Sequence, residues 1–133
     1  MNQERMSAAE ARADWRIGVD LPWPAKALHP NSRPHWRKKA SAVKSARFEA
    51  CQMAKPIGKI YDTCEIKVTC IFSPPPLKRN RDLDNLVAAC KAYFDGIADA
   101  IGIDDSHFQH QAPVWGLPRK GGNVKIILEP ILE

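Results

Sequence analysis

The segment KRNRDLDNLVAACK, residues 78–91, places two aspartates next to a group of cations. Asp82 and Asp84 are two residues apart, and the cations before them are Lys78, Arg79 and Arg81. Mg²⁺ binds oxygen ligands in proteins, typically one or two carboxylates together with water and a substrate phosphate. Such a metal ion polarises a phosphodiester bond, and nearby cations hold the backbone and offset charge in the transition state. The segment is therefore a candidate site for cutting a nucleic-acid backbone.

A purely structural role explains the same two aspartates. Asp82 lies where the N-cap of a helix is expected, and its carboxylate would accept hydrogen bonds from free backbone N–H groups. Asp84, in the first turn, would complement the positive end of the helix dipole. This reading does not account for the three cations or for the acidic pair Asp104 and Asp105 just beyond the predicted helix. Both readings stay open at this point.

The rest of the sequence predicts the elements that must position these side chains. Alternating apolar residues predict strands, and apolar residues at i, i+3 and i+4 predict helices. The predicted strands are 15–23, 63–76 and 123–129, with a possible strand within 103–116, and the predicted helices are 35–55 and 82–102. The glycine pair 121–122 predicts a hairpin turn before the last strand. This β-α-β-α-β-β order predicts an α+β fold with a mixed sheet and two main helices.

A length of 133 residues predicts one domain, residues 15–133, behind a polar, flexible tail of residues 1–14. Residues 22–36 contain four prolines and predict a long loop, and long ordered loops are often functional. In the helix 35–55, the residues predicted to face the core are Ala40, Val43, Phe48, Cys51 and Met53. The tryptophans at 23, 36 and 115 either stack on exposed bases or pack in the loops and the core.

Positive charge is modest in total but clustered along the chain. The sequence has 20 Lys and Arg against 15 Asp and Glu, a formal net charge of +5. A second cluster of cations, within the predicted helix 35–55, consists of Arg37, Lys38, Lys39, Lys44 and Arg47. Clustered cations suit a polyanion because each neutralised phosphate releases counterions; a solvated helix face is the other reading. The candidate DNA-binding residues are Lys78, Arg79, Arg81, Asn31, Arg33 and Arg37.

The cysteines and the N-terminus predict the compartment. No C-x-x-C pair occurs, so the four cysteines are predicted to be reduced, mostly core residues in a reducing compartment. The N-terminus lacks the apolar segment of a signal peptide. No apolar run approaches the roughly 20 residues that a membrane helix needs. The sequence therefore predicts a soluble cytoplasmic protein with no membrane partner.

The stretch RDLDNL…K…FDGIADAIGIDDSHF resembles the core motif of the RusA-type Holliday junction resolvases. LPWPAKALHPNSR resembles the N-terminal strand and proline-rich loop of that family, and KGGNVKIILE resembles its closing hairpin. The likeness runs from about Ile17 to Glu129. It implies a small phage or prophage endonuclease of DNA recombination and repair, which resolves four-way junctions with Mg²⁺ or Mn²⁺. It also implies a homodimer that makes two symmetric cuts.

The resemblance implies roles for four residues. The catalytic, metal-binding carboxylates of the family fall on Asp82, Asp84 and Asp105. Its catalytic lysine falls on Lys91, in the stretch KAYFD. That match requires a three-residue insertion relative to the shorter family pattern, which otherwise places Ala88 at the lysine position.

The predicted helix sets a geometric problem for these residues. One straight helix over 83–100 would be roughly 27 Å long, at about 1.5 Å per residue. The first two carboxylates lie at its start and Asp105 lies beyond its end, so one metal ion cannot reach all three directly. Either the loop 102–107 folds back, or the helix breaks near Gly96, or a second subunit supplies Asp105. An intertwined homodimer that shares the site is the favoured prediction.

Two other function classes remain open. One is a non-catalytic module of the same fold that binds junction or duplex DNA, and the displaced lysine favours it. The other is a structural phage protein with an ordinary capped helix.

Overall fold

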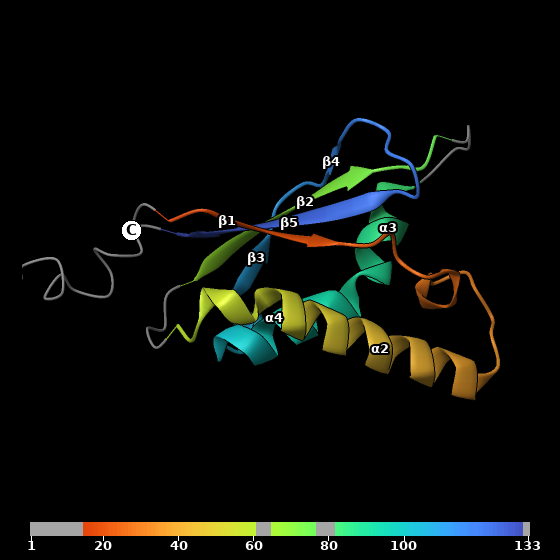
Figure 1. Ribbon diagram of the computed structural model, residues 1–133, viewed down its shortest axis with the longest axis horizontal. Helices are drawn as coiled ribbons and strands as arrows, with labels where there is room; N and C mark the ends of the chain where they lie inside the picture. The colour runs from red at the N-terminus through yellow and green to blue at the C-terminus, as the bar shows by residue number, and fades with distance from the viewer. Residues whose placement is uncertain (1–14, 61–64, 77–81, 132–133) are drawn as a thin grey trace, which may run out of the picture.

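The computed structural model describes residues 15–60, 65–76 and 82–131. A five-stranded mixed sheet forms one layer, and the helices cover one of its faces (Figure 1). The strands are β1 (Ile17–Leu21), β2 (Ile66–Ser73), β3 (Phe108–His110), β4 (Val114–Trp115) and β5 (Asn123–Pro130). The helices are α2 (Trp36–Ala54), α3 (Leu83–Ala89) and α4 (Lys91–Ile101), with short 3₁₀ turns η2 (Lys26–Leu28), η3 (Lys55–Ile57) and η4 (Asp105–His107).

The predicted α+β class and the mixed sheet are confirmed, with three helices instead of two and one more strand than predicted. Several predictions fall outside the described residues. These are the tail 1–14, Cys64, and the cations Lys78, Arg79 and Arg81.

Strand β2 lies in the middle of the sheet. β5 runs antiparallel to it and to β1, so β5 fills the place between them. β3 and β4 follow one another along the opposite edge of β2, and both run parallel to it. Gly121 and Gly122 do make a turn with left-handed φ values of 79° and 76°. The predicted hairpin is nevertheless wrong, because β4 and β5 lie on opposite sides of β2 and do not pair.

The core lies between the sheet and the helices. Strands alternate their side chains between two faces, and the inward set on β2 and β5 is almost fully buried. These inward residues are Ile66, Val68, Cys70, Phe72, Val124, Ile126 and Leu128. From the helix layer, α4 contributes Phe94, Ile97 and Ile101, which are also buried. α4 is thus the helix that fills most of the space beneath the sheet.

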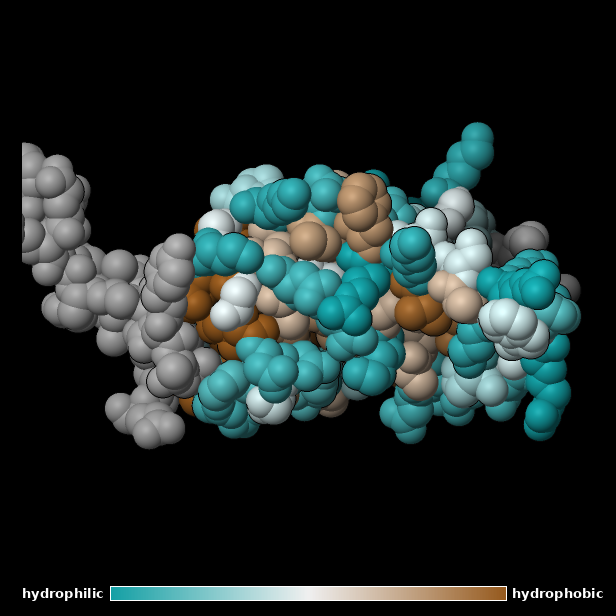
Figure 2. All heavy atoms as spheres, turned by 90° about the horizontal axis from the view of Figure 1, so that it is seen from below, coloured by the Kyte–Doolittle hydropathy of each residue, from teal (hydrophilic) through white to brown (hydrophobic). Residues whose placement is uncertain are grey.

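Helix α2 packs through alanines, and the core face predicted for it is wrong. Ala46, Ala50 and Ala54 are buried, whereas Phe48 is 64% exposed. Among the five predicted residues, only Cys51 packs against the core. Seen from the helix side in Figure 2, hydrophilic side chains cover most of the surface, with small separate apolar areas between them.

The alanine face follows from how closely α2 and α4 approach. A methyl group added at Gly96 would overlap the backbone carbonyl of Arg47 and lie 2.9 Å from the Ala50 Cβ atom. Larger residues at the contact would force the helices apart, since packed interiors leave little free volume. A pattern of hydrophobic residues gives most weight to large side chains, so in α2 it predicts the wrong face as the buried one.

The helix predicted over 82–102 is two helices. The chain turns at Cys90, where φ is −90° and ψ is 6°. Cys90 is fully buried, and its carbonyl accepts from the backbone N–H groups of Tyr93 and Phe94. Because of this turn, α4 lies beside α2 while α3 rises toward the sheet (Figure 1). The predicted break near Gly96 is wrong, since Gly96 is inside α4.

Two further features concern the cysteines and the length of the apolar helices. Cys51, Cys70 and Cys90 are free thiols, and burial raises the pKa of the Cys70 thiol to about 12. No helix in the described part of the chain is both long and apolar enough to cross a membrane.

Candidate functional site

Asp82 is the N-cap of α3, as the structural reading predicts. Its Oδ1 atom accepts hydrogen bonds from the backbone N–H groups of Asp84, at 2.9 Å, and Asn85, at 3.4 Å. Asp84 lies in the first turn and is exposed. The capping bonds use one carboxylate oxygen of Asp82. The other oxygen and the Asp84 carboxylate belong to the same exposed end of the helix.

Lys91 and Asp105 come together at the other helix. Lys91 begins α4, and its Nζ atom lies 3.5 Å from Asp105 Oδ2 and 3.4 Å from Asp95 Oδ1. The charge of Asp95, with that of Asp105, raises the pKa of Lys91. The lysine is therefore a cation held between two carboxylates. Asp95 was not among the predicted site residues, although its i+4 spacing from Lys91 is that of a helical ion pair.

The chain after α4 brings Asp105 back to this point. Gly102 ends α4 with φ 76°, in the left-handed region that favours glycine. Asp104 then caps η4 by accepting from the Ser106 backbone N–H at 3.0 Å. His107 Nδ1 lies 2.7 Å from Glu65 Oε2, which ties η4 to the residue before β2.

The three predicted routes were ways to bring Asp105 to Asp82 and Asp84. The loop 102–107 does fold back, as in the first route, and the contact that it makes is with Lys91. This contact forms within one chain. The favoured route, in which a second subunit supplies Asp105, is not needed for it.

The four residues of the predicted site thus form two pairs in the described structure. Among the described residues, no three His, Cys, Asp or Glu side chains are grouped so that they could hold a metal ion. Mg²⁺ often takes only one or two carboxylates, with water and a substrate phosphate, so a Mg²⁺ site at Asp82 and Asp84 stays a prediction. Asp105 is engaged by Lys91 instead. A site with all three carboxylates stays a prediction.

An ion pair fixes α4 on α2 close to this lysine. The guanidinium of Arg47 donates to both carboxylate oxygens of Asp99, at 2.6 Å and 2.9 Å. The bond from Arg47 lowers the pKa of Asp99. Arg47, Asp99, Asp95 and Asp105 line one cavity of about 380 Å³. The acidic side of α4 is thus held in place by a cation from α2.

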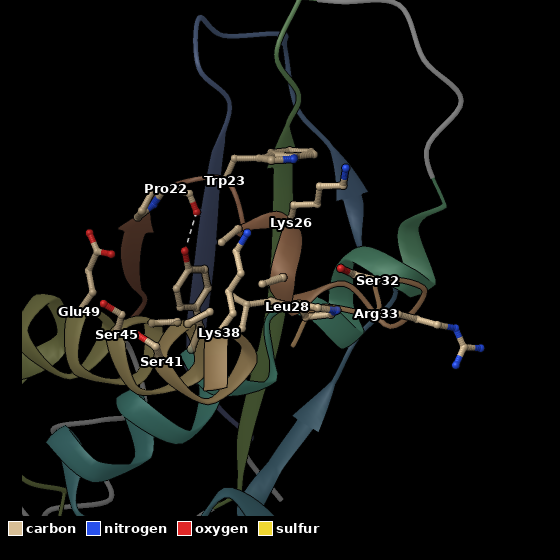
Figure 3. Close-up of a pocket in the computed structure, with 16 residues that line it drawn as sticks. Pro22, Trp23, Lys26, Leu28, Ser32, Arg33, Lys38, Ser41, Ser45 and Glu49 are labelled. Atoms are coloured by element: carbon tan, nitrogen blue, oxygen red, sulfur yellow. Dashed lines mark hydrogen bonds between the residues drawn. The ribbon is translucent and has the colours of Figure 1, made fainter. Parts of the chain in front are cut away.

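The proline-rich loop forms a second, larger cavity with α2. Its volume is about 780 Å³ (Figure 3). Arg33, one of the predicted DNA contacts, lies at its edge and points away from it (Figure 3). Asn31 is exposed in the same loop. Arg37 lies in the first turn of α2, with its guanidinium 5.1 Å from the centre of the Trp36 ring. Asn31 and Arg33 thus belong to the loop and Arg37 to the start of α2.

Comparison with known proteins relates the chain to a bacterial protein. No protein-family model matches the chain. A protein of Xylella fastidiosa, described as uncharacterized, is 39% identical over 118 residues, which cover 86% of this chain and 77% of that protein. The chain belongs to the same family as this Xylella fastidiosa protein.

Proposed function

We propose that the protein is a Mg²⁺-dependent, structure-selective endodeoxyribonuclease that resolves four-way DNA junctions. It acts as a homodimer, in which each subunit cuts one strand, since a two-fold dimer suits a substrate of near two-fold symmetry. The proposal takes its substrate and dimer from the resemblance to the RusA-type resolvases. It takes its chemistry from the residues at α3, α4 and η4.

The contact between Lys91 and Asp105 is the observation that carries the proposal. These two residues are 14 positions apart, and the fold-back at Gly102 is what brings their side chains to 3.5 Å. Both belong to the set of four that the resemblance marks as catalytic. A capped helix alone has no need of this contact. The lysine match, which requires an insertion in the sequence, therefore gains support from the position of its side chain.

In this mechanism Asp82 and Asp84, the exposed carboxylates at the start of α3, would hold Mg²⁺, and the bound ion would supply polarisation of the scissile phosphodiester bond. Lys91, kept cationic by Asp95 and Asp105, stabilises the negative charge that develops on the phosphate. Asp105 orients Lys91 through the contact between their side chains. In the pattern that the resemblance implies, it would also contribute a carboxylate to the metal site. Lys78, Arg79 and Arg81 hold the backbone of one arm.

The second candidate is a DNA-binding module of the same fold without turnover. The capping bonds of Asp82 favour it, because they give that carboxylate a role that needs no metal ion. In this case the Asp82 side chain would matter for stability and not for chemistry.

A cleavage assay separates the two. A labelled four-way junction and a matched linear duplex are incubated with Mg²⁺ or with EDTA, using the wild type and Asp82→Asn. Paired symmetric nicks in the junction alone, absent with EDTA and in the variant, support the nuclease. Asparagine also caps helices well, so a loss of cleavage in this variant does not follow from unfolding. Tight junction binding without nicks in any divalent metal would support the binding module.

A further inference from the structure

The cavity under the proline-rich loop has walls of two kinds. One wall is the loop itself, with Trp23, Lys26 and Leu28. The other is a flank of α2, with Lys38, Ser45 and Glu49 among its residues. Figure 3 shows the Lys38 side chain rising from α2 toward the loop, while Ser41 and Ser45 line the helix wall.

The cavity has a rigid floor. The Tyr93 hydroxyl donates a 2.8 Å hydrogen bond to the carbonyl oxygen of Pro22, and Tyr93 is 2% exposed. This bond joins the start of the loop to α4. Leu28 and Ala46 are also buried and lie in the lining. The shape of the cavity is therefore fixed by the core, and binding would not require the loop to fold.

Charge is distributed unevenly around the cavity. Glu49 lies at one end of the lining, and the two lysines lie toward the other end, Lys38 on α2 and Lys26 on the loop, with the Lys26 amine directed away from Lys38 (Figure 3). The two lysines, with Arg33 at the edge, make this end cationic, and their flexible side chains suit a phosphate there. A carboxylate near the other end disfavours a second phosphate, because like charges repel. Serine hydroxyls and an aromatic ring in the lining suit a neutral, planar group with hydrogen-bonding edges. A nucleotide with one phosphate combines these features.

We propose that this cavity binds one unpaired nucleotide of a DNA strand, with its phosphate at Lys26 and Lys38 and its base near Trp23. A volume of about 780 Å³ holds a nucleotide with its water, since small-molecule sites range over roughly 300–1,000 Å³. Aromatic side chains bind unpaired bases regardless of sequence because every base has a π face. The inference rests on the proposed function in taking DNA as the ligand, and it names the part of the DNA that is held: a nucleotide outside the duplex.

The test measures the affinity for a fluorescein-labelled, ten-residue oligothymidylate in EDTA, where no metal-dependent cleavage occurs. Ser45→Trp fills the cavity without changing the charge, and Ser45 is exposed on α2, so the fold tolerates it. We expect at least a tenfold loss of affinity. Lys38→Gln should lower the slope of log affinity against log salt by about 0.7, the value for one phosphate of a single strand. Lys125→Gln makes the same charge change on exposed β5 and should leave the slope unchanged.

The outcomes separate this inference from the nuclease. If Ser45→Trp binds the oligonucleotide as the wild type does, the inference is overturned, whatever the cleavage assay shows. If thymidine monophosphate binds in the cavity and the oligonucleotide does not, the site takes free nucleotides and the inference also fails. If the cavity variants lose binding while no preparation cuts junctions, the inference stands and the nuclease proposal falls. Circular dichroism of each variant checks that the fold is retained.

Discussion

The carboxylates at the two ends of the α3–α4 segment are held in position in different ways. At the start of α3, Asp82 bonds to backbone N–H groups two and three residues later. Beyond the end of α4, Asp105 reaches Lys91 only because the chain turns at Gly102 and η4 is fixed to Glu65 through His107. The first arrangement depends on neighbouring residues. The second depends on contacts between distant parts of the chain.

This difference says what each carboxylate can reveal about function. A local arrangement such as the cap of α3 occurs in any helix that begins with aspartate, so it does not identify a site. The ion pair between Lys91 and Asp105 forms only because the chain folds back after α4. Helix formation alone does not bring these two residues together. The pair at Lys91 is therefore the stronger indication of chemistry, even though the D-L-D motif is more conspicuous in the sequence.

The largest expected effect is on catalysis, through Asp105 and its contact with Lys91. Asp105→Asn removes the partner that orients Lys91, and we expect junction cleavage to fall at least about 100-fold, as when one electrostatic group of an active site is lost. The free energy of unfolding should change by less than about 0.5 kcal/mol, because the Lys91 side chain is 72% exposed and exposed pairs stabilise little. Single-turnover cleavage and urea denaturation measure the two quantities.

Asp20→Asn is the matched control, since it removes one exposed carboxylate on β1. It should leave both quantities unchanged. Full cleavage by Asp105→Asn would mean that the fold-back pair has no catalytic role.

The next effect concerns the contact between α2 and α4, the helix that precedes Asp105. Gly96→Ala introduces a methyl group against the Arg47 carbonyl, and overpacking of this kind costs about 1–3 kcal/mol of unfolding free energy. Urea denaturation measures the loss. In the control, Gly18→Ala, the new methyl group meets only the side-chain ends of Ile127 and Lys125, so a smaller loss is expected. Equal losses in both variants would show that α2 and α4 can move apart at little cost.

A smaller effect on stability is expected at the start of α3, where Asp82 is the N-cap. Asp82→Ala removes the N-cap of α3, and we expect a loss of about 1 kcal/mol in the free energy of unfolding. Asp82→Asn should lose much less, because asparagine also accepts the capping bonds. Thermal unfolding of both variants at one protein concentration measures the difference. If alanine and asparagine give the same stability, the cap seen at α3 contributes nothing in solution.

The smallest effect is a dependence on pH. Because the bond from Arg47 lowers the pKa of Asp99 in the folded state, the pair stabilises the protein above the ordinary pKa of aspartate, near about 4. That contribution is lost as the pH falls through the lowered pKa, where the carboxylate becomes protonated. We expect Asp99→Asn to be slightly less stable than the wild type at pH 6. The difference in stability between the wild type and Asp99→Asn should disappear on acidification. Unfolding curves at several pH values measure it, and a difference that stays constant with pH would contradict the prediction.

Much of the fold follows from local rules in the sequence. The alternation in β2 placed that strand near its observed bounds, because the period of apolar residues reports burial. The bounds predicted for α2 were also close to those observed, although its predicted core face was wrong. The cap at Asp82 and the stop at Gly102 were also predictable, since each depends on the backbone preferences of a single residue.

What the sequence did not reveal is set by contacts between elements. No proline or glycine in the sequence indicates the turn at Cys90. The alanine face of α2 follows from the approach of Gly96, 50 residues after Ala46. For the candidate site, Asp105 and Lys91 were predicted as members but not as partners. The cavity lined by Lys26 and Lys38 depends on how the loop lies over α2, which no spacing in the sequence encodes.

The position of β5 has a consequence for how the protein is made. β5 pairs with β1 on one side and β2 on the other, so the first and central strands have no direct pairing with each other. At about 5–20 residues per second on the ribosome, β1 and β2 wait several seconds with open edges before residues 123–130 emerge. Unpaired strand edges invite pairing with other chains. A nascent chain that stops before β5 is therefore expected to need a chaperone, and premature termination there should give insoluble fragments.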